Sequence, residues 1–292
     1  MQNQEIYIVS QAIRYIEEHL ERKIDLENVA SALNYSKYYL HRIFVRTVGL
    51  TIHDYIQRRQ FTKAAKLLAF SKKPIMEIAL ESGCESQQAF TDIFKKMYKV
   101  TPARYRTAAN FYPLQLEMQL KQSYKKPDIT KNDIRFAALS DVNDWMDLVC
   151  LTVDGYPCLN EREYLENLYR YISDKQALIL RDEGKAIGIM GFSTEKSSID
   201  FLAIHPQYRN LGMEKIFIDK LMDELIVGKE ISLTTYRKGD RADTGYRKKY
   251  ISLGFQEREL LTEYGYPTQR FVLSPENRGK TQNEEISKQL EK

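Results

Sequence analysis

The sequence is poor in cysteine, contains one tryptophan and has no long hydrophobic run. Its three cysteines, Cys84, Cys150 and Cys158, are odd in number and include no Cys-x-x-Cys pair. This pattern argues against a disulfide framework and against a zinc site, so we expect no metal and a reducing compartment. No apolar stretch approaches the ~18 residues of a membrane helix, and residues 1–20 lack the features of a secretory signal. We therefore expect a cytoplasmic protein without a membrane partner.

Positive charge is concentrated in the first third of the chain. Residues 1–108 contain 17 Lys and Arg against 11 Asp and Glu, whereas the remainder contains 27 against 29. The net charge of +4 for the whole chain therefore hides a value of +6 for this segment. Such an excess is expected where a domain meets a polyanion, although charged surfaces also serve solubility.

The hydrophobic pattern changes along the chain, whose 292 residues are enough for about two domains. Residues 6–106 show helical apolar spacing from one segment to the next. Later, β-rich runs alternate with amphipathic stretches; these runs are 177–180, 186–192, 199–204, 231–235 and 270–273. We predict a multidomain protein with the following parts: an all-α domain over 1–108, a linker over 109–133, a mixed α/β domain over 134–274 and a disordered tail over 275–292.

The all-α domain is predicted to contain two helix-turn-helix units. In the first, Asp25 can cap a short helix, Asn34 suits the left-handed turn that ends it, and Ser36 can cap the second helix. The arrangement repeats with Gly83 at the turn and Ser86 as the cap, 50 residues after Ser36. A short helix, a tight turn and a second helix are the parts of this motif.

A single long helix over 52–68 is expected to join the two units. At 1.5 Å per residue it would measure roughly 25 Å, which suits two helices that enter successive major-groove faces about 34 Å apart. The candidate DNA contacts are the outward polar residues of the second helix of each unit. They are Lys37, Tyr38, His41, Arg42 and Arg46 in the first unit and Gln87, Gln88, Thr91, Lys95 and Lys96 in the second.

These side chains differ in the contacts that they can make. Arg42 can read guanine with two hydrogen bonds, and Gln87 or Gln88 can read adenine, each pair contributing about 1–3 kcal/mol of discrimination. Arg46, Lys95 and Lys96 are better suited to phosphate, which makes affinity depend on salt. The aromatic residues Tyr39, Phe44, Phe90, Phe94 and Tyr105 are expected in the core.

Several segments of this domain resemble the AraC/XylS family of bacterial regulators. They are SKYYLHRIF (36–44), YIQRR (55–59), GCESQQAF (83–90) with the following FKK, and TPARYR (101–106). The resemblance covers essentially all of residues 6–106. It implies a monomer that reads double-stranded DNA with two helices, and RNA polymerase is a further partner in that interpretation. It implies base contacts by Tyr38, His41, Arg42, Gln87, Gln88 and Thr91. Asp92 departs from the arginine that the family frequently has there, and we do not count it as a contact.

A second motif surrounds Gly212 in the α/β domain. A strand over 199–204 ends at His205-Pro206, and a short loop leads to Gly212 and an amphipathic helix. Backbone N–H groups at such a helix start can face an anion, and Arg209 adds positive charge, which suits a pyrophosphate. The alternative is that Gly212 serves only as a turn. With Tyr250 and the pair Gly254-Phe255, this region resembles the GNAT-type N-acetyltransferases over about 134–273.

The resemblance implies acetyl-CoA as the cofactor. The pyrophosphate would be held by Arg209, Asn210, Leu211 and Gly212, and the pantetheine arm would lie along Leu202 and Ile204. Tyr250 would be the general acid, unless it only packs against Tyr246. Glu214 departs from the glycine or alanine of the family and would lie near the phosphates.

Three functions remain open at this point. The protein could be a regulator whose C-terminal domain binds acetyl-CoA or another small ligand. It could also be a bifunctional regulator that transfers an acetyl group to a small amine. In the third, the C-terminal domain only contacts other proteins. Glu214 favours the first or the third function, whereas Tyr250 with Gly212 favours the second.

Overall fold

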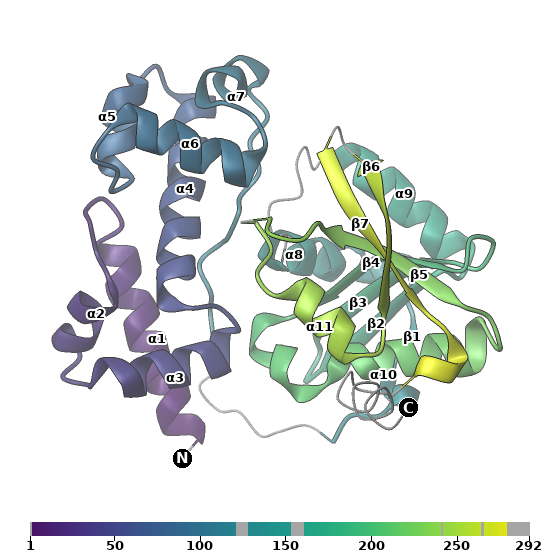
Figure 1. The fold of residues 1–292 in the computed structure, drawn as a ribbon. Helices are drawn as coiled ribbons and strands as arrows, with labels where there is room; N and C mark the ends of the chain where they lie inside the picture. Colours follow the sequence, from purple (N-terminus) through teal and green to yellow (C-terminus); the bar gives the residue numbers. More distant parts are fainter. Residues whose placement is uncertain (1, 121–127, 153–160, 241, 264–265, 279–292) are drawn as a thin grey trace, which may run out of the picture. The chain divides into compact units, whose positions relative to one another are not determined.

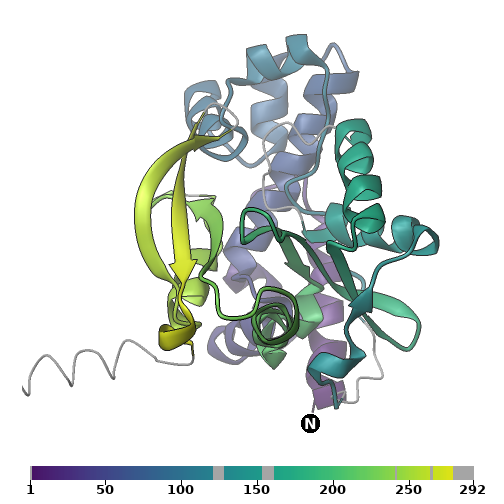
Figure 2. The same ribbon diagram turned by 90° about the vertical axis from the view of Figure 1, so that its right-hand side faces the viewer.

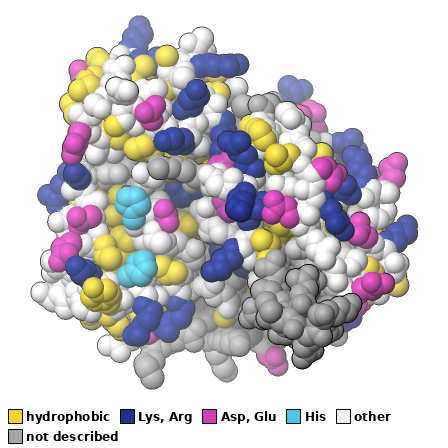
Figure 3. Space-filling model, viewed as in Figure 1, with side chains coloured by type: hydrophobic (Ala, Val, Ile, Leu, Met, Phe, Trp, Pro, Cys, Tyr) yellow, Lys and Arg dark blue, Asp and Glu magenta, His cyan; other side chains and the backbone are white. Residues whose placement is uncertain are grey.

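The computed structural model describes residues 2–120, 128–152, 161–240, 242–263 and 266–278. The chain forms two compact units, the first built mainly from the chain up to Asp128 and the second mainly from the chain that follows. Within the described ranges, no helix is both long and apolar enough to cross a membrane. Hydrophobic side chains form scattered patches on the face shown in Figure 3.

The first unit is all-α, as predicted. Its helices are α1 (Gln2–Glu18), α2 (Leu26–Ala32), α3 (Lys37–Val48), α4 (Ile52–Phe70), α5 (Ile75–Glu81), α6 (Gln87–Tyr98) and α7 (Pro102–Ala108). In Figure 1, α1, α2 and α3 lie at one end of α4, and α5, α6 and α7 lie at the other. The predicted pair of helix-turn-helix units and the helix that joins them are therefore confirmed.

The predicted caps and turns of the two units are also present. The side chains of Asp25, Ser36 and Ser86 each accept a hydrogen bond from the backbone N–H three residues later. Each cap satisfies one of the N–H groups that a helix start leaves without an intrahelical partner. Asn34 and Gly83 have positive φ angles of 56° and 74° and make the turn between the helices. Local sequence therefore determines where α2, α3 and α6 begin.

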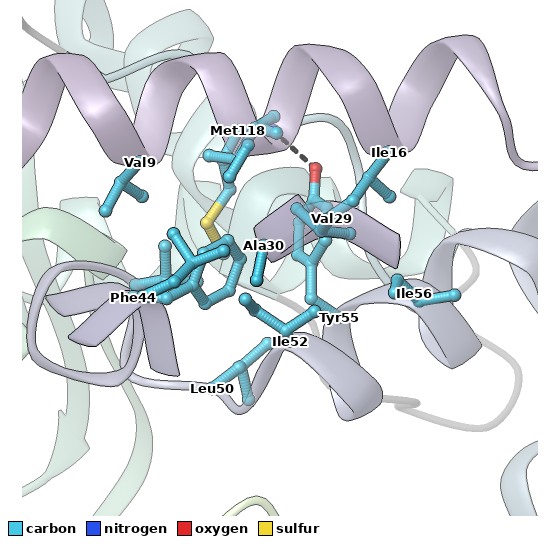
Figure 4. Close-up of a cluster of buried hydrophobic side chains, with 14 of the residues drawn as sticks. Val9, Ile16, Val29, Ala30, Phe44, Leu50, Ile52, Tyr55, Ile56 and Met118 are labelled. Carbon is cyan, nitrogen blue, oxygen red and sulfur yellow. Dashed lines mark hydrogen bonds between the residues drawn. The ribbon is translucent and has the colours of Figure 1, made fainter. Parts of the chain in front are cut away.

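Two hydrophobic cores share α4. The first core lies between α1, α2, α3 and the first half of α4, and includes Ile52 and Tyr55 (Figure 4). The second core lies between the rest of α4 and α5, α6 and α7, and includes Phe61 and Leu68. Because one continuous helix contributes to both cores, each helix-turn-helix unit is anchored to the same rod.

The chain after α7 returns along α4 in an extended conformation, as the teal trace in Figure 1 shows. Tyr112 and Leu114 are buried in the second core, and Met118 is buried in the first. The first unit therefore extends past residue 108, and part of the segment predicted as a linker is packed. An extended segment held by a neighbouring helix has no periodicity of its own, so its sequence carries little signal.

The second unit is a mixed α/β domain, and its described residues form a seven-stranded sheet in the order β1-β2-β3-β4-β5-β7-β6. Its strands are β1 (Arg135–Phe136), β2 (Ala177–Asp182), β3 (Lys185–Ser193), β4 (Ser198–Ile204), β5 (Ile231–Tyr236), β6 (Gln256–Glu263) and β7 (Tyr266–Leu273). Its α-helices are α8 (Val142–Thr152), α9 (Glu161–Ser173), α10 (Met213–Lys220) and α11 (Tyr246–Ser252). A π-helix over Leu221–Leu225 continues α10. All five predicted β-rich runs lie within strands.

The sheet changes character between β4 and β5. Strands β1 to β4 pair antiparallel, as do β5, β7 and β6. By contrast, β4 and β5 are parallel, and their recorded register consists of Ser198 opposite Ser232. Figure 2 shows the part formed by β5, β7 and β6 turning away from β1 to β4. Strands β4 and β5 therefore diverge beyond Ser198 and Ser232.

The end of the domain lies later than the sequence predicted. Pro275–Asn277 form a 3-10 helix, and Arg278 makes ion pairs with Asp219 and Asp223, so the described part of the predicted tail is ordered against the domain. Gly254 has a φ of 94°, and a side chain there would collide with the carbonyl of Asn277. Residues 279–292 of the predicted tail lie outside the described residues.

Candidate functional site

The ten predicted DNA contacts occupy the outer faces of α3 and α6. Thr91 is half-buried, and the other nine residues are exposed. The opposite faces are fully buried, with Leu40 and Phe44 on α3 and Phe90 and Phe94 on α6. Because helical residues three or four apart share a face, burial of one stripe turns the polar stripe outward. Both helices therefore present polar side chains to the surrounding solution.

Tyr38 and Arg42 are the most informative side chains on α3. Tyr38 is 79% exposed, which is high for a large aromatic ring and leaves it available for stacking or hydrogen bonding. The guanidinium of Arg42 lies 5.8 Å from the centre of the Tyr39 ring, within the range of a cation–π contact. This contact restricts the guanidinium while its hydrogen-bond donors stay accessible.

Two cations of α3 already have acidic partners. Lys37 Nζ lies 3.2 Å from Glu27 Oε2, and Arg46 makes an ion pair with Glu5 of α1. The pair of Lys37 is largely exposed, so phosphate can compete for it. Glu5 is mostly buried, with a side chain that is 16% exposed, so Arg46 is the more strongly engaged of the two. Of the cations predicted to contact phosphate, Lys95 and Lys96 are therefore the better placed.

The sequence did not identify the residues that connect the two helix-turn-helix units. Gln60, in the middle of α4, is 8% exposed, and its Nε2 donates to the carbonyl oxygens of Leu20 at 3.2 Å and Arg22 at 3.1 Å. A Cβ on Gly83 would lie 3.3 Å from the same nitrogen. Gln60 therefore contacts the loop after α1 and the turn before α6. The type and position of this residue gave no signal, because a glutamine in a helix is usually a surface residue.

The predicted coenzyme residues begin at the end of β4. Leu202 and Ile204 lie on β4, and Arg209, Asn210 and Leu211 lie in a 3-10 helix over Pro206–Leu211 rather than in the predicted loop. Proline has a fixed φ that suits the first helical position, which explains this helix. Gly212 is exposed with a φ of 77°, and a Cβ there would meet no atom within 4 Å. The turn into α10 therefore has the expected open glycine.

Glu214 occupies the first turn of α10 and is 6% exposed. One carboxylate oxygen makes an ion pair with Lys249 of α11, and the other accepts no hydrogen bond from the described residues. A diphosphate at this helix start would meet a second negative charge, and Lys249 is already engaged. Electrostatic repulsion is strong where water is excluded. This carboxylate therefore disfavours a diphosphate, such as that of coenzyme A, at the start of α10.

Tyr250, the predicted general acid, is part of a buried aromatic group. It is 8% exposed, stacks on Tyr246 with ring centres 6.4 Å apart, and meets Phe255 edge to face at 5.6 Å. Burial, reinforced by Tyr246 and Glu214, raises the pKa of Tyr250 well above its usual value. A general acid works best with a pKa near the working pH, so this shift makes the hydroxyl a poorer proton donor.

Comparison with known proteins identifies the first unit. The sequence model of the helix-turn-helix domain family matches residues 29–108. The TetD protein of transposon Tn10 from Escherichia coli is 41% identical over 99 residues, which cover 34% of this chain and 72% of TetD. The chain belongs to the AraC family of helix-turn-helix proteins. These findings support an AraC-type DNA-binding transcription regulator.

Similarity to other relatives covers less of their length. The uncharacterized HTH-type transcriptional regulator YbfP of Bacillus subtilis is also 41% identical over 99 residues, but these make up 34% of YbfP. A GNAT-family acetyltransferase structure from Bacillus cereus shares 14% identity with a TM-score of 0.38, over 48% of this chain and 95% of that one. The family assignment of this AraC-family protein therefore comes from its first unit.

Proposed function

We propose that this AraC-family protein regulates transcription by reading one duplex at two neighbouring major-groove sites, with α3 at one site and α6 at the other. The observation that carries the proposal is the outward polar face of each helix, held on opposite ends of α4. The 19 residues of α4 span about 28 Å at 1.5 Å per residue. This length is close to one turn of B-DNA, about 34 Å.

Each exposed side chain has a role in this proposal. Arg42 reads a guanine with two hydrogen bonds, Gln87 or Gln88 reads an adenine, and Tyr38 and His41 contact neighbouring bases. Thr91 contacts a base from its half-buried position on α6. The ammonium groups of Lys95 and Lys96, with Lys37 and Arg46, bind phosphate and add affinity that depends on salt rather than on sequence.

The test uses the full chain and a duplex selected from a randomised pool, with binding followed by fluorescence anisotropy. Arg42→Ala should weaken binding to this duplex about 5- to 150-fold, which corresponds to about 1–3 kcal/mol, and should relax the preference at one base pair. Arg14→Ala removes the same charge from the exposed face of α1 and serves as the matched control. An equal loss on selected and random duplexes would contradict base reading by Arg42.

For the C-terminal domain we propose binding of a small ligand without acetyl transfer. The divergence of β4 and β5 supports ligand binding, because ligands of open α/β sheets bind in the crevice at the carboxyl ends of strands where neighbouring strands part. The ion pair of Glu214 with Lys249 and the buried Tyr250 disfavour use of acetyl-CoA. An amine acceptor or a surface for another protein, including RNA polymerase, has less support from the described contacts.

Calorimetric titration with acetyl-CoA tests this second proposal. We expect no heat of binding for the wild-type chain at millimolar coenzyme. In Glu214→Ala, measurable binding should appear because the negative charge is removed and Lys249 becomes available. Glu224→Ala removes an exposed acidic side chain from the following π-helix and should behave like the wild type. Tight binding of acetyl-CoA to the wild type would restore the acetyltransferase hypothesis, which release of free thiol with added amines would then test.

A further inference from the structure

The segment Phe111–Met118, which we call the strap, lies beside α4 and is anchored at both ends of it. We propose that the strap is a second brace of the DNA reader, which holds α3 and α6 at a set separation and makes binding selective for the spacing of the two half-sites. The proposal rests on the two-site reading proposed above. It adds residues that lie beyond the family match, which ends at residue 108.

Side chains of the strap enter both hydrophobic cores. Tyr112 and Leu114 are 5% and 1% exposed in the core of the second helix-turn-helix unit. Met118 is 4% exposed in the core of the first helix-turn-helix unit, and Figure 4 shows its side chain directed into that cluster. Burial of each large apolar side chain contributes about 1.5–3 kcal/mol. The strap is therefore held by both helix-turn-helix units, and each of them loses packing if the strap detaches.

The middle of the strap is hydrogen-bonded to Thr62, which lies halfway along α4 and is 5% exposed. Thr62 Oγ1 accepts the backbone N–H groups of Leu114 at 3.0 Å and Gln115 at 3.1 Å. Its own proton goes to the carbonyl oxygen of Arg58, at 2.8 Å. One hydroxyl therefore satisfies two buried backbone donors, which would otherwise carry a penalty of about 1–3 kcal/mol each.

Further hydrogen bonds fix the strap on either side of Thr62. On the side of the second helix-turn-helix unit, the Tyr105 hydroxyl accepts the N–H of Tyr112 at 3.1 Å. On the side of the first helix-turn-helix unit, Arg59 Nη1 donates to the carbonyl of Gln115 at 2.7 Å. The Tyr55 hydroxyl accepts the N–H of Met118 at 3.4 Å. The last of these is the dashed line in Figure 4. The strap is thus attached along its length and not only at its ends.

Two parallel connections resist motions that one helix allows. A lone helix bends and twists about its axis, and each such motion changes the direction in which α3 faces relative to α6. A strap fixed at both ends of α4 and at its centre must break contacts before the two units can rotate. A rigid link gives the second contact a high effective concentration when the half-sites match its geometry and a low one when they do not.

The experiment compares two threonines with the same local hydrogen bond. The hydroxyls of Thr62 and Thr107 each donate to the carbonyl four residues earlier, in the latter case at 3.1 Å. Only Thr62 is recorded accepting from the strap. Thr62→Val therefore removes the strap bonds with little change in volume, and Thr107→Val is the matched control. Full-length variants are measured on the selected duplex and on one with two base pairs inserted between the half-sites.

We expect the insertion to weaken wild-type binding about 100-fold, since two extra pairs rotate one half-site by roughly 70° about the duplex axis. In Thr62→Val this penalty should fall to about tenfold or less, while Thr107→Val keeps the wild-type penalty. An unchanged penalty in Thr62→Val would overturn the proposal, even if affinity for both duplexes falls together, because equal losses report stability alone.

A second variant guards against misfolding. If circular dichroism shows that Thr62→Val is unfolded, Leu114→Ala is measured in the same way, with Leu80→Ala, at an exposed position of α5 outside the strap, as its control. A reduced spacing penalty for Leu114→Ala alone supports the strap as a brace, and a wild-type penalty in both overturns it. A wild-type chain whose affinity ignores the insertion would instead refute two-site reading itself. The two proposals therefore fail in distinguishable ways.

Discussion

Arg59 and Glu17 form a two-point ion pair between α4 and α1, with Arg59 Nε 2.7 Å from Oε1 and Nη2 2.6 Å from Oε2. Both side chains are largely buried, at 15% and 14% exposure. The remaining terminal nitrogen of Arg59 donates to the strap at Gln115. A single guanidinium therefore joins three segments of the DNA-binding unit, and its planar fork is what makes three directed hydrogen bonds possible.

This ion pair predicts that the stability of the DNA-binding unit depends on having both Arg59 and Glu17. Arg59→Leu should destabilise the first unit by about 3 kcal/mol, because it leaves the Glu17 carboxylate partly buried without its cation. The double variant Arg59→Leu with Glu17→Leu should recover much of this loss. Urea unfolding followed by circular dichroism measures both. Losses that simply add in the double variant would show that the two side chains do not interact.

The caps of the recognition helices predict matched losses of stability. Ser36→Ala and Ser86→Ala should each cost about 1 kcal/mol, because each removes the acceptor of a helix-start N–H group. Ser31→Ala, at an exposed position within α2, should be nearly neutral and is the control. Thermal unfolding gives the comparison. Equal effects at all three serines would argue that capping is not the cause.

Substitution of Lys95 or Lys96 is predicted to change how strongly DNA affinity depends on salt. Each substitution by alanine should reduce the slope of log affinity against log salt by about one and weaken selected and random duplexes alike. Lys66→Ala, on the exposed surface of α4, controls for the loss of one positive charge. Anisotropy titrations at several KCl concentrations provide the slopes. A lysine variant that loses affinity only for the selected duplex would indicate a base contact instead.

Asp141 predicts that the C-terminal domain loses stability at acidic pH. Its carboxylate is 2% exposed, and hydrogen bonds from Arg135, then from a backbone N–H and from Arg181, hold its pKa well below the usual range. A pKa lowered by folding stabilises the native state above the unfolded pKa of about 4, and this contribution is lost as pH falls through the folded value. Asp141→Asn should therefore destabilise the domain by up to about 3 kcal/mol at pH 7.

The difference between Asp141→Asn and wild type should narrow as the pH falls below about 4. Thermal unfolding followed by the fluorescence of Trp145, which lies in α8, reports on this domain. Asp147→Asn on the exposed face of the same helix is the control and should show no such trend. A constant difference between pH 7 and pH 3 would exclude the ion pairs as its source.

The outer faces of α3 and α6 illustrate what could be predicted from sequence. Ser36 and Ser86 cap the helices through atoms three residues away, and the apolar stripes recur at helical spacing, so both signals lie within a short stretch of chain. The caps, the turn at Gly83 and the long helix α4 were therefore predicted correctly. The segment predicted as a linker after residue 108 was not seen as part of the domain, because its packing depends on α4.

The coenzyme region shows the same limit. Glu214 was identified as a departure, but its pairing with Lys249, 35 residues later, could not be read from either residue. The same holds for the divergence of β4 from β5, which lie on either side of α10. Ion pairs and strand register depend on which elements meet in space, whereas spacing along one element reports only its own exposed and buried faces.

The sequence by itself determined the two capped helix-turn-helix units, the character of both domains and the polar faces of α3 and α6, because local hydrogen bonds and helical periodicity control these features. Only the tertiary structure decided that Tyr112, Leu114 and Met118 fasten the chain after α7 to both cores, and that Glu214 is buried against Lys249. The physical reason is that these contacts join residues distant in sequence, and their free energy is gained only once the surrounding helices have packed.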